Sequence, residues 1–218
     1  MFFCLRVDLD YVPWDTPDAQ EFGHGEPATF LRLLDLSRGL GLRLHFFASN
    51  RVLRAFSSTA EAVLNEGHDL DWLCKHPEVG PERREELNQL FLALGHSAQG
   101  LAVSGVWPNG AHPGVTEGLR FISAHAGSAP PAGLKMYPVE SRTLRDASRH
   151  GVSARAWTDS LKGQIRDYAS RNKGLTVVVR PQVLGKYDSK LSHLKEVLEL
   201  TLAIGMEVKT LRQLERGD

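Results

Sequence analysis

Cysteine, long apolar runs and an excess of either charge are all scarce in this chain of 218 residues. Its two cysteines, Cys4 and Cys74, make no disulfide framework and predict a reducing compartment, with the cytoplasm as the expected location. No segment approaches the roughly 18 consecutive apolar residues of a membrane span, so no membrane insertion is expected. Lysine plus arginine equals aspartate plus glutamate at 26 each, which predicts no attraction to nucleic acid or to an anionic membrane.

The proportions of apolar and charged residues, 42% and 24%, are those of a soluble globular protein. The length suits one α/β domain with a full core. No repeat, low-complexity tract or charge run marks a linker, and the stretch 127–133, which contains glycine and proline, is interpreted as a loop. The sequence therefore predicts a single domain over residues 1–218.

Segments with strand-like and helix-like patterns alternate along the chain. The clearest buried strand is the β-branched run 175–179, and a clear amphipathic helix spans 81–94. The other expected strands are 3–10, 42–48, 69–73, 100–103, 134–137, 152–157 and 206–209. The other expected helices are 26–38, 61–65, 115–126, 140–149 and 189–203. Such alternation is typical of a parallel α/β barrel or a doubly wound sheet.

The first expected strand ends in two carboxylates, Asp8 and Asp10. Side chains two residues apart on a strand project to the same face, so these acids repel each other and resist desolvation. A bound cation, a shared proton or an open polar cleft relieves such a pair. The pair therefore indicates a functional site, and the alternative is a solvated strand end that leads into a loop.

Further polar residues follow later strands of the expected fold. In both α/β architectures, chemistry gathers at the carboxyl ends of the strands. The residues expected there beside the acid pair are His76, the segment 107–112, Asp159 and Arg180. Their convergence predicts a site at this edge of the sheet.

Four short motifs, in order along the chain, resemble the polysaccharide deacetylase family, whose domain is the chitooligosaccharide deacetylase homology domain. The motifs are Val7-Asp8-Leu9-Asp10, Leu44-His45-Phe46-Phe47-Ala48, Glu66-Gly67-His68-Asp69-Leu70 and Val177-Val178-Val179-Arg180-Pro181. The last one is followed by a long helix and a final strand, as in the family. The resemblance implies a single-domain, irregular or incomplete parallel (β/α) barrel. It also implies hydrolysis of N-acetyl groups on carbohydrates with a divalent metal, preferably zinc.

The resemblance assigns roles to residues by their position in the motifs. Asp8 corresponds to the catalytic base, Asp10 to a metal ligand and His76 to a second metal ligand, so His76 is expected close to Asp10. A hydrolytic zinc site needs about three protein ligands and a water. The residues that could supply the third ligand are His68, Asp71 and His112.

Two departures from the family pattern affect its chemistry. The position of the first metal-binding histidine is held by Leu73 or, in a shifted register, by Trp72, and neither side chain can bind a metal. The position of the general-acid histidine is held by Arg180. A guanidinium stays protonated, so Arg180 can stabilise an oxyanion but cannot transfer a proton. A metal is therefore expected to be weakly bound or absent.

Three functions compete at this stage. In the first, Asp8 takes a proton from a metal-bound water that attacks an N-acetyl carbonyl, and Arg180 helps to hold the oxyanion. In the second, the barrel is a catalytically inactive module that binds a carbohydrate or a small amide ligand, and the missing ligand and general acid favour this one. In the third, the Asp-x-Asp opening resembles that of haloacid-dehalogenase-type phosphatases. Their mechanism also needs a later lysine and a downstream acidic pair, for which Lys135 and Asp159 are poor substitutes.

Overall fold

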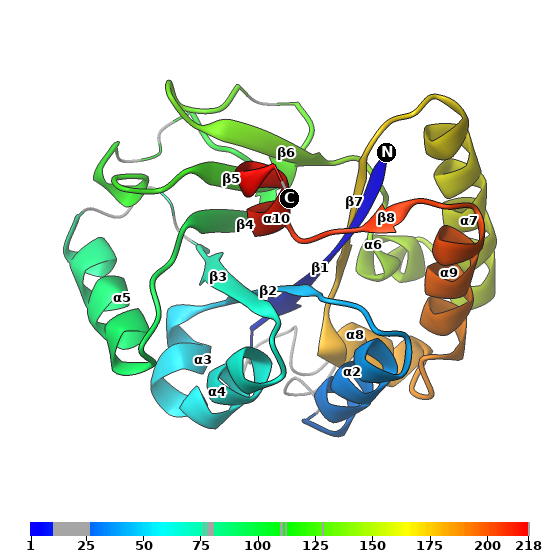
Figure 1. Ribbon diagram of the computed structural model, residues 1–218, viewed down its shortest axis with the longest axis horizontal. Helices are drawn as coiled ribbons and strands as arrows, with labels where there is room; N and C mark the ends of the chain where they lie inside the picture. Colours follow the sequence, from blue (N-terminus) through cyan, green and yellow to red (C-terminus); the bar gives the residue numbers. More distant parts are fainter. Residues whose placement is uncertain are drawn as a thin grey trace.

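The computed structural model describes residues 1–10, 27–75, 77, 81–109, 111, 113–127 and 129–217. Seven parallel strands close into a barrel with helices around it, so the expected irregular parallel (β/α) barrel is confirmed (Figure 1). The barrel strands are β1 (Phe2–Leu9), β2 (His45–Ala48), β3 (Asp69–Leu73), β4 (Gly100–Val106), β5 (Phe121–His125), β6 (Lys135–Val139) and β7 (Leu175–Val179). A two-residue strand, β8 (Glu207–Val208), pairs with the start of β1.

The barrel closes because β1 pairs with both β2 and β7. The strands follow one another around the ring in sequence order. The junction of β6 and β7 has one described register pair, Val139 with Thr176, and is the least regular seam. Since all the strands are parallel, their carboxyl ends meet at one edge, where the polar strand ends were expected to converge.

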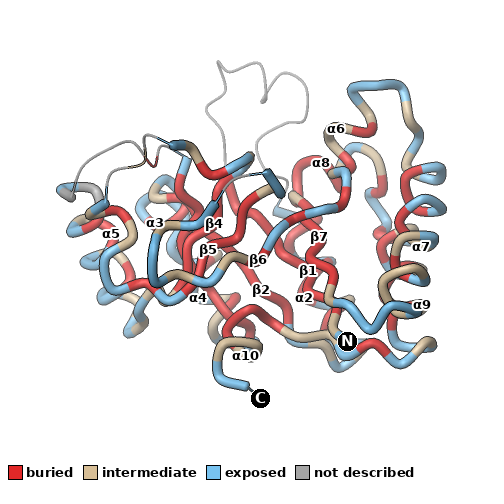
Figure 2. Tube along the Cα trace, turned by 90° about the horizontal axis from the view of Figure 1, so that it is seen from above, coloured by how far each residue is buried: buried red, intermediate tan, exposed pale blue. Residues whose placement is uncertain are grey.

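Helices cover the outside of the barrel unevenly (Figures 1 and 2). The covering helices are α2 (Pro27–Gly39), α3 (Asn50–Ala55), α4 (Ser57–Asn65), α5 (Pro81–Ala93), α6 (Leu144–Arg149), α7 (Ala154–Ser170), α8 (Pro181–Tyr187) and α9 (Ser192–Ala203). A further helix, α10 (Leu211–Arg216), lies at the amino ends of β2 and β3. Between β4 and β5 the described chain forms a short 3₁₀ helix, η1 (Pro113–Val115). Among the described residues, no helix has both the length and the apolar character needed to cross a bilayer.

Alternate residues of β1 face opposite sides of the barrel wall. Leu5 and Val7 pack outward in the large core between the strands and the helices. Cys4 points inward and joins a smaller apolar cluster inside the barrel. Arg6 and Asp8 share the inward face with Cys4 and are fully buried. The interior is therefore partly apolar and partly charged, which requires that its charges be paired.

The predicted helix 115–126 is wrong. The apolar residues Val115, Leu119 and Ile122 have helical spacing, but η1 ends at the first of them. Gly118 then adopts a left-handed φ of 72°, which interrupts a helix, and the chain continues into β5. Tertiary pairing of β5 with β4 and β6 outweighs the local helical pattern.

The predicted strand 152–157 is also wrong, because these residues form the start of α7. The Ser153 hydroxyl accepts a hydrogen bond from the backbone N–H of Ala156 and caps this helix. Trp157 begins its buried stripe and continues with Leu161 and Ile165 at intervals of four residues. A short apolar run cannot by itself distinguish a strand from a helix start.

Substitution of Gly100 tests the packing of the barrel interior. A Cβ atom at Gly100 would lie 2.1 Å from the Phe121 ring, whereas a Cβ atom at Gly105, on the same strand, has nothing within 4 Å. We expect Gly100→Ala to lower the free energy of unfolding by about 1–3 kcal/mol through overpacking. The matched control Gly105→Ala should change it by less than about 0.5 kcal/mol in chemical denaturation. Equal effects would contradict the described position of Phe121.

Candidate functional site

A pocket opens at the carboxyl ends of β1, β4, β5 and β7. We call it the Arg180 pocket. The polar residues on its wall include Arg6, Asp8, Ser104, His125, Arg145 and Arg180. Leu144 of α6, together with Val183 and Leu184 of α8, makes an apolar side. This is the edge at which the sequence predicted a site, and it combines charged and apolar surface in one hollow.

Asp8 lies at the base of the pocket in a buried ion pair with Arg6. The Arg6 Nε and Nη2 atoms donate to the two Asp8 carboxylate oxygens at 2.7 and 2.9 Å. The other Arg6 donors bond to the Val103 carbonyl and to the Ser123 carbonyl and hydroxyl oxygens. All five guanidinium N–H groups are thus engaged. Both oxygens of the predicted catalytic base therefore accept hydrogen bonds from a fixed cation.

Asp10, the predicted metal ligand, is paired with a lysine. The Lys75 Nζ atom lies 2.6 Å from Asp10 Oδ2, and the Asp10 carboxylate is only 4% exposed. The backbone carbonyl of Asp10 also accepts a hydrogen bond from Gln182 Nε2 at 3.3 Å. An ammonium group of the chain itself is therefore already paired with the carboxylate that the resemblance assigns to a metal.

Arg180 follows β7 directly and lines the pocket from the N-terminal end of α8. Its Nη2 atom donates to the Ser104 hydroxyl at 2.8 Å and lies 4.0 Å from Asp8 Oδ2. The side chain is 14% exposed. The predicted proximity of Arg180 and Asp8 is therefore present, and two guanidinium groups flank one carboxylate.

His125, at the end of β5, was missed by sequence reasoning. It lines the pocket. Burial is the main cause that lowers the pKa of its imidazole, and the charges of Arg6 and Arg180 lower it further. The charges of Asp146 and Asp8 raise this pKa but do not cancel the decrease. The imidazole is therefore neutral at neutral pH and can both donate and accept a hydrogen bond. The alternation of Phe121, Ser123 and His125 along a strand is the signal that could have revealed it, but the predicted helix 115–126 covers this segment.

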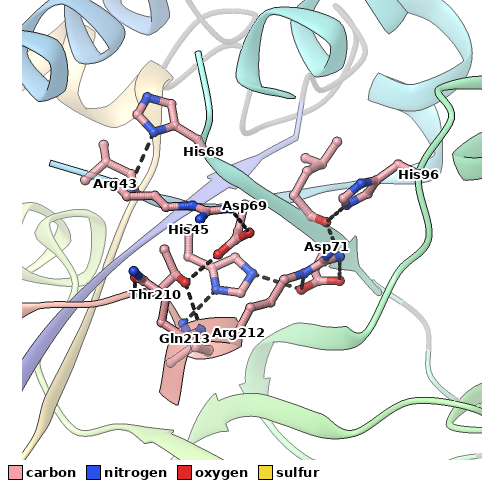
Figure 3. A network of polar contacts seen from close by, with 12 residues as sticks. Arg43, His45, His68, Asp69, Asp71, His96, Thr210, Arg212 and Gln213 are labelled. Atoms are coloured by element: carbon pink, nitrogen blue, oxygen red, sulfur yellow. Dashed lines mark hydrogen bonds and ion pairs between the residues drawn. The ribbon is translucent and has the colours of Figure 1, made fainter. Parts of the chain in front are cut away.

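Asp71 takes part in a buried network at the opposite end of the barrel, where α10 closes the amino ends of the strands (Figure 3). Its carboxylate accepts hydrogen bonds from Arg212 Nε and Nη2 at 2.8 and 2.6 Å. It also accepts hydrogen bonds from the backbone N–H groups of Gln99 and Gly100. His45 Nε2 is a further partner of the same carboxylate. Burial raises the pKa of Asp71, but the hydrogen bonds and charge of Arg212 and His45 outweigh it and lower the pKa to about 2. Both carboxylate oxygens of Asp71 are thus hydrogen-bonded to other residues, and these contacts lie away from the acid pair.

His68 contacts neither carboxylate of the acid pair. Its Nδ1 atom accepts a hydrogen bond from the Leu44 N–H (Figure 3). Its Nε2 atom lies 3.1 Å from the Ser37 hydroxyl oxygen. Burial lowers the pKa of this imidazole. His68 therefore joins β2, β3 and α2 as a neutral hydrogen-bonded residue.

His76 and His112 lie outside the described residues, so the expected contact of His76 with Asp10 stays a prediction. Asp159 does not follow a strand, since it lies on α7 and pairs with Arg155 at the surface. Of the two residues aligned with the missing histidine ligand, Leu73 packs in the interior apolar cluster.

Among the described residues, the donors near the acid pair do not by themselves fit the metal that the family resemblance implies. Asp8 and Asp10 are each bonded to a cationic side chain. Within the described ranges, no three histidine, cysteine, aspartate or glutamate side chains are grouped so as to hold a metal ion. A cation site here would require Asp10 to exchange Lys75 for the metal.

Comparison with known proteins supports the fold. No family model matches this sequence, and no curated protein matches it. A probable polysaccharide deacetylase from Pseudomonas aeruginosa PAO1 superposes with a TM-score of 0.77 and 12% identity, over 98% of this chain and 89% of that one. PuuE allantoinase gives 0.74 and 12%, over 98% and 89%. A mutant of a CE4 family pseudoenzyme with restored enzymatic activity gives 0.57 and 11%, over 98% and 67%.

At such low sequence identity, structural similarity is evidence for the fold alone. This chain has the fold of the polysaccharide deacetylases, and the resemblance drawn from its motifs is confirmed at that level. The PuuE allantoinase shares the fold, so the fold leaves the substrate open.

Substitution of Asp71 tests its role in stability. Asp71→Asn leaves Arg212 without its buried counter-charge and should cost about 3–5 kcal/mol at neutral pH. Because the pKa of Asp71 is lower when folded, the wild type should also lose about 2 kcal/mol as the pH falls from 4 towards 2, and the variant should lack this loss.

The control is Asp35→Asn, which removes a 69% exposed carboxylate that pairs with Arg38. Chemical denaturation across this pH range measures all three proteins. If the Asp71 and Asp35 variants were equally stable, the buried network would not hold the barrel end.

Proposed function

We propose that this protein is a catalytically inactive, ligand-binding relative of the deacetylase-fold hydrolases. Its ligand is a carbohydrate or a small amide that binds in the Arg180 pocket. One observation carries the proposal: both acids that deacetylation would use are neutralised by cations of the chain itself, Asp8 by Arg6 and Asp10 by Lys75.

The replacement at Arg180 supports the same function. This side chain stays charged at any working pH and cannot give a proton to a departing amine. General-acid help of that kind is worth roughly a hundred- to ten-thousandfold in rate. The pocket keeps its shape and polar groups without the groups that would drive the reaction, which suits binding.

A working deacetylase is the second candidate. It is favoured by the placement of Asp8, Asp10 and Arg180 together at the carboxyl ends of β1 and β7. It requires a metal to displace Lys75 from Asp10. It also requires a third ligand, although His68 and Asp71 have other partners.

A haloacid-dehalogenase-type phosphatase has the least support. Lys135 pairs with Glu215 of α10, beside the amino ends of the strands, and Asp159 lies on the surface of α7. Neither residue lines the Arg180 pocket beside Asp8. Lys135 and Asp159 therefore do not supply the lysine and the acidic groups of that mechanism.

Metal content and acetate release test the proposal. Protein purified without chelator and dialysed should hold well below one equivalent of zinc by elemental analysis. Its acetate release from N-acetylglucosamine oligomers should not exceed that of Asp8→Asn, because the acids are already paired. Stoichiometric zinc, together with acetate release that disappears in Asp8→Asn, would contradict the proposal and support the working deacetylase.

Substitution of Lys75 tests whether its ammonium group excludes a metal. Lys75→Met removes the cation from Asp10 and leaves a nearly buried carboxylate, so zinc affinity measured by calorimetry should rise by about tenfold or more. The control Lys195→Met removes a lysine of the exposed pair with Glu199 on α9 and should leave zinc affinity unchanged. Equal zinc affinity in the two variants would show that Lys75 does not exclude the metal.

A further inference from the structure

From the charges of the Arg180 pocket we infer that its ligand carries a carboxylate: a small polyhydroxylated acid of the hexuronate class, whose carboxylate binds Arg180. This inference rests on the proposed function and names the ligand class of the same site. It concerns the chemistry of recognition and requires neither a metal nor a reaction.

Counted over the described residues that line it, the pocket has a net positive charge. Three arginines line it, Arg6, Arg145 and Arg180, against two aspartates, Asp8 and Asp146. Arg6 and Asp8 cancel each other as a closed ion pair, so they contribute little field to a ligand. His125 is neutral. One positive charge therefore remains in excess, in a hollow whose low-dielectric walls strengthen its attraction for an anion.

Arg180 carries this excess because its own charge is only partly compensated. The carboxylate that pairs with it, Asp8, lies 4.0 Å away, and both oxygens of that carboxylate already accept hydrogen bonds from Arg6. In the described part of the chain, the one side-chain hydrogen bond of Arg180 goes to the neutral Ser104 hydroxyl. A guanidinium that is only 14% exposed and lacks a directly bonded anion favours a carboxylate in its remaining donor positions.

The rest of the wall suits the polyhydroxylated part of such a ligand. The neutral imidazole of His125 offers a donor and an acceptor for hydroxyl groups. The apolar residues of the lining, Leu144, Val183 and Leu184, can pack against the C–H faces of a sugar ring. A ligand with a carboxylate at one end and a hydroxylated ring at the other therefore matches both parts of the pocket.

Calorimetric titration of the full chain tests the inference. The probes are D-glucuronate and D-galacturonate, with D-glucose and D-galactose as matched neutral sugars and acetate as a bare carboxylate. A charge-assisted hydrogen bond is worth about 1.5–3 kcal/mol, so at least one uronate should bind about tenfold or more tightly than its neutral match and than acetate.

The variants locate the binding in the pocket. Arg180→Gln should reduce uronate affinity to that of the neutral sugar, and Arg180→Lys, which keeps the charge, should recover part of it. The control Arg155→Gln removes one positive charge from the surface of α7, where Arg155 pairs with Asp159 and Glu196, and should have no effect. Circular dichroism establishes that each variant is folded, and the wild-type comparison of charged with neutral sugars does not depend on any variant.

Several outcomes would overturn the inference. They are equal binding of neutral and acidic sugars, equal binding of acetate, tighter binding of inorganic phosphate, no uronate binding, and uronate binding that survives in Arg180→Gln. Equal binding of a neutral sugar leaves the proposed function standing, because the pocket then still binds a carbohydrate. Failure of the proposed function has a different readout, namely stoichiometric zinc and acetate release.

Discussion

A fully buried ion pair between Arg6 and Asp8 holds the centre of this barrel together. The Arg6 guanidinium reaches across the interior from β1 to the Val103 carbonyl of β4 and to Ser123 of β5. A charge at this depth persists only when every donor has a partner, and removal of one partner from such a pair typically costs about 3–5 kcal/mol. The geometry of three strands, and with it the base of the Arg180 pocket, therefore depends on one side chain.

Charged side chains are paired more completely at the amino end of the barrel than at the carboxyl end. At the amino end, Asp71, Arg212 and His45 satisfy one another beneath α10, and the network is closed to solvent. At the carboxyl end, Lys75 is 42% exposed and Arg180 borders an open pocket, so the charges there are paired less completely. Groups that satisfy each other stabilise the fold, whereas incompletely compensated groups remain able to bind a ligand. The family motifs contributed residues to both ends, so motif position alone did not separate structural acids from those at the site.

Whether a contact could be predicted from the sequence depended on how far apart its two residues are along the chain. Strand periodicity placed Asp8 at a site, and the same rule puts Arg6 on its face, so this partner was within reach of the sequence. The pairing of Lys75 depends on how the chain turns after β3, which no local pattern specifies. His125 was hidden by a helical spacing that β-sheet pairing overrode. The network beneath α10 could not be foreseen, because Arg212 is 141 residues from Asp71.

That separation has a consequence for the order in which the protein can fold. Any nascent chain that has not yet reached residue 212 contains Asp71 without its arginine, and Asp69 without the Thr210 hydroxyl that bonds to it. Docking of α10 at the amino end of the barrel closes a very long loop, and contacts of such high sequence separation form slowly. The Asp71 carboxylate therefore gains its buried counter-charge only at a step that follows synthesis of the barrel strands.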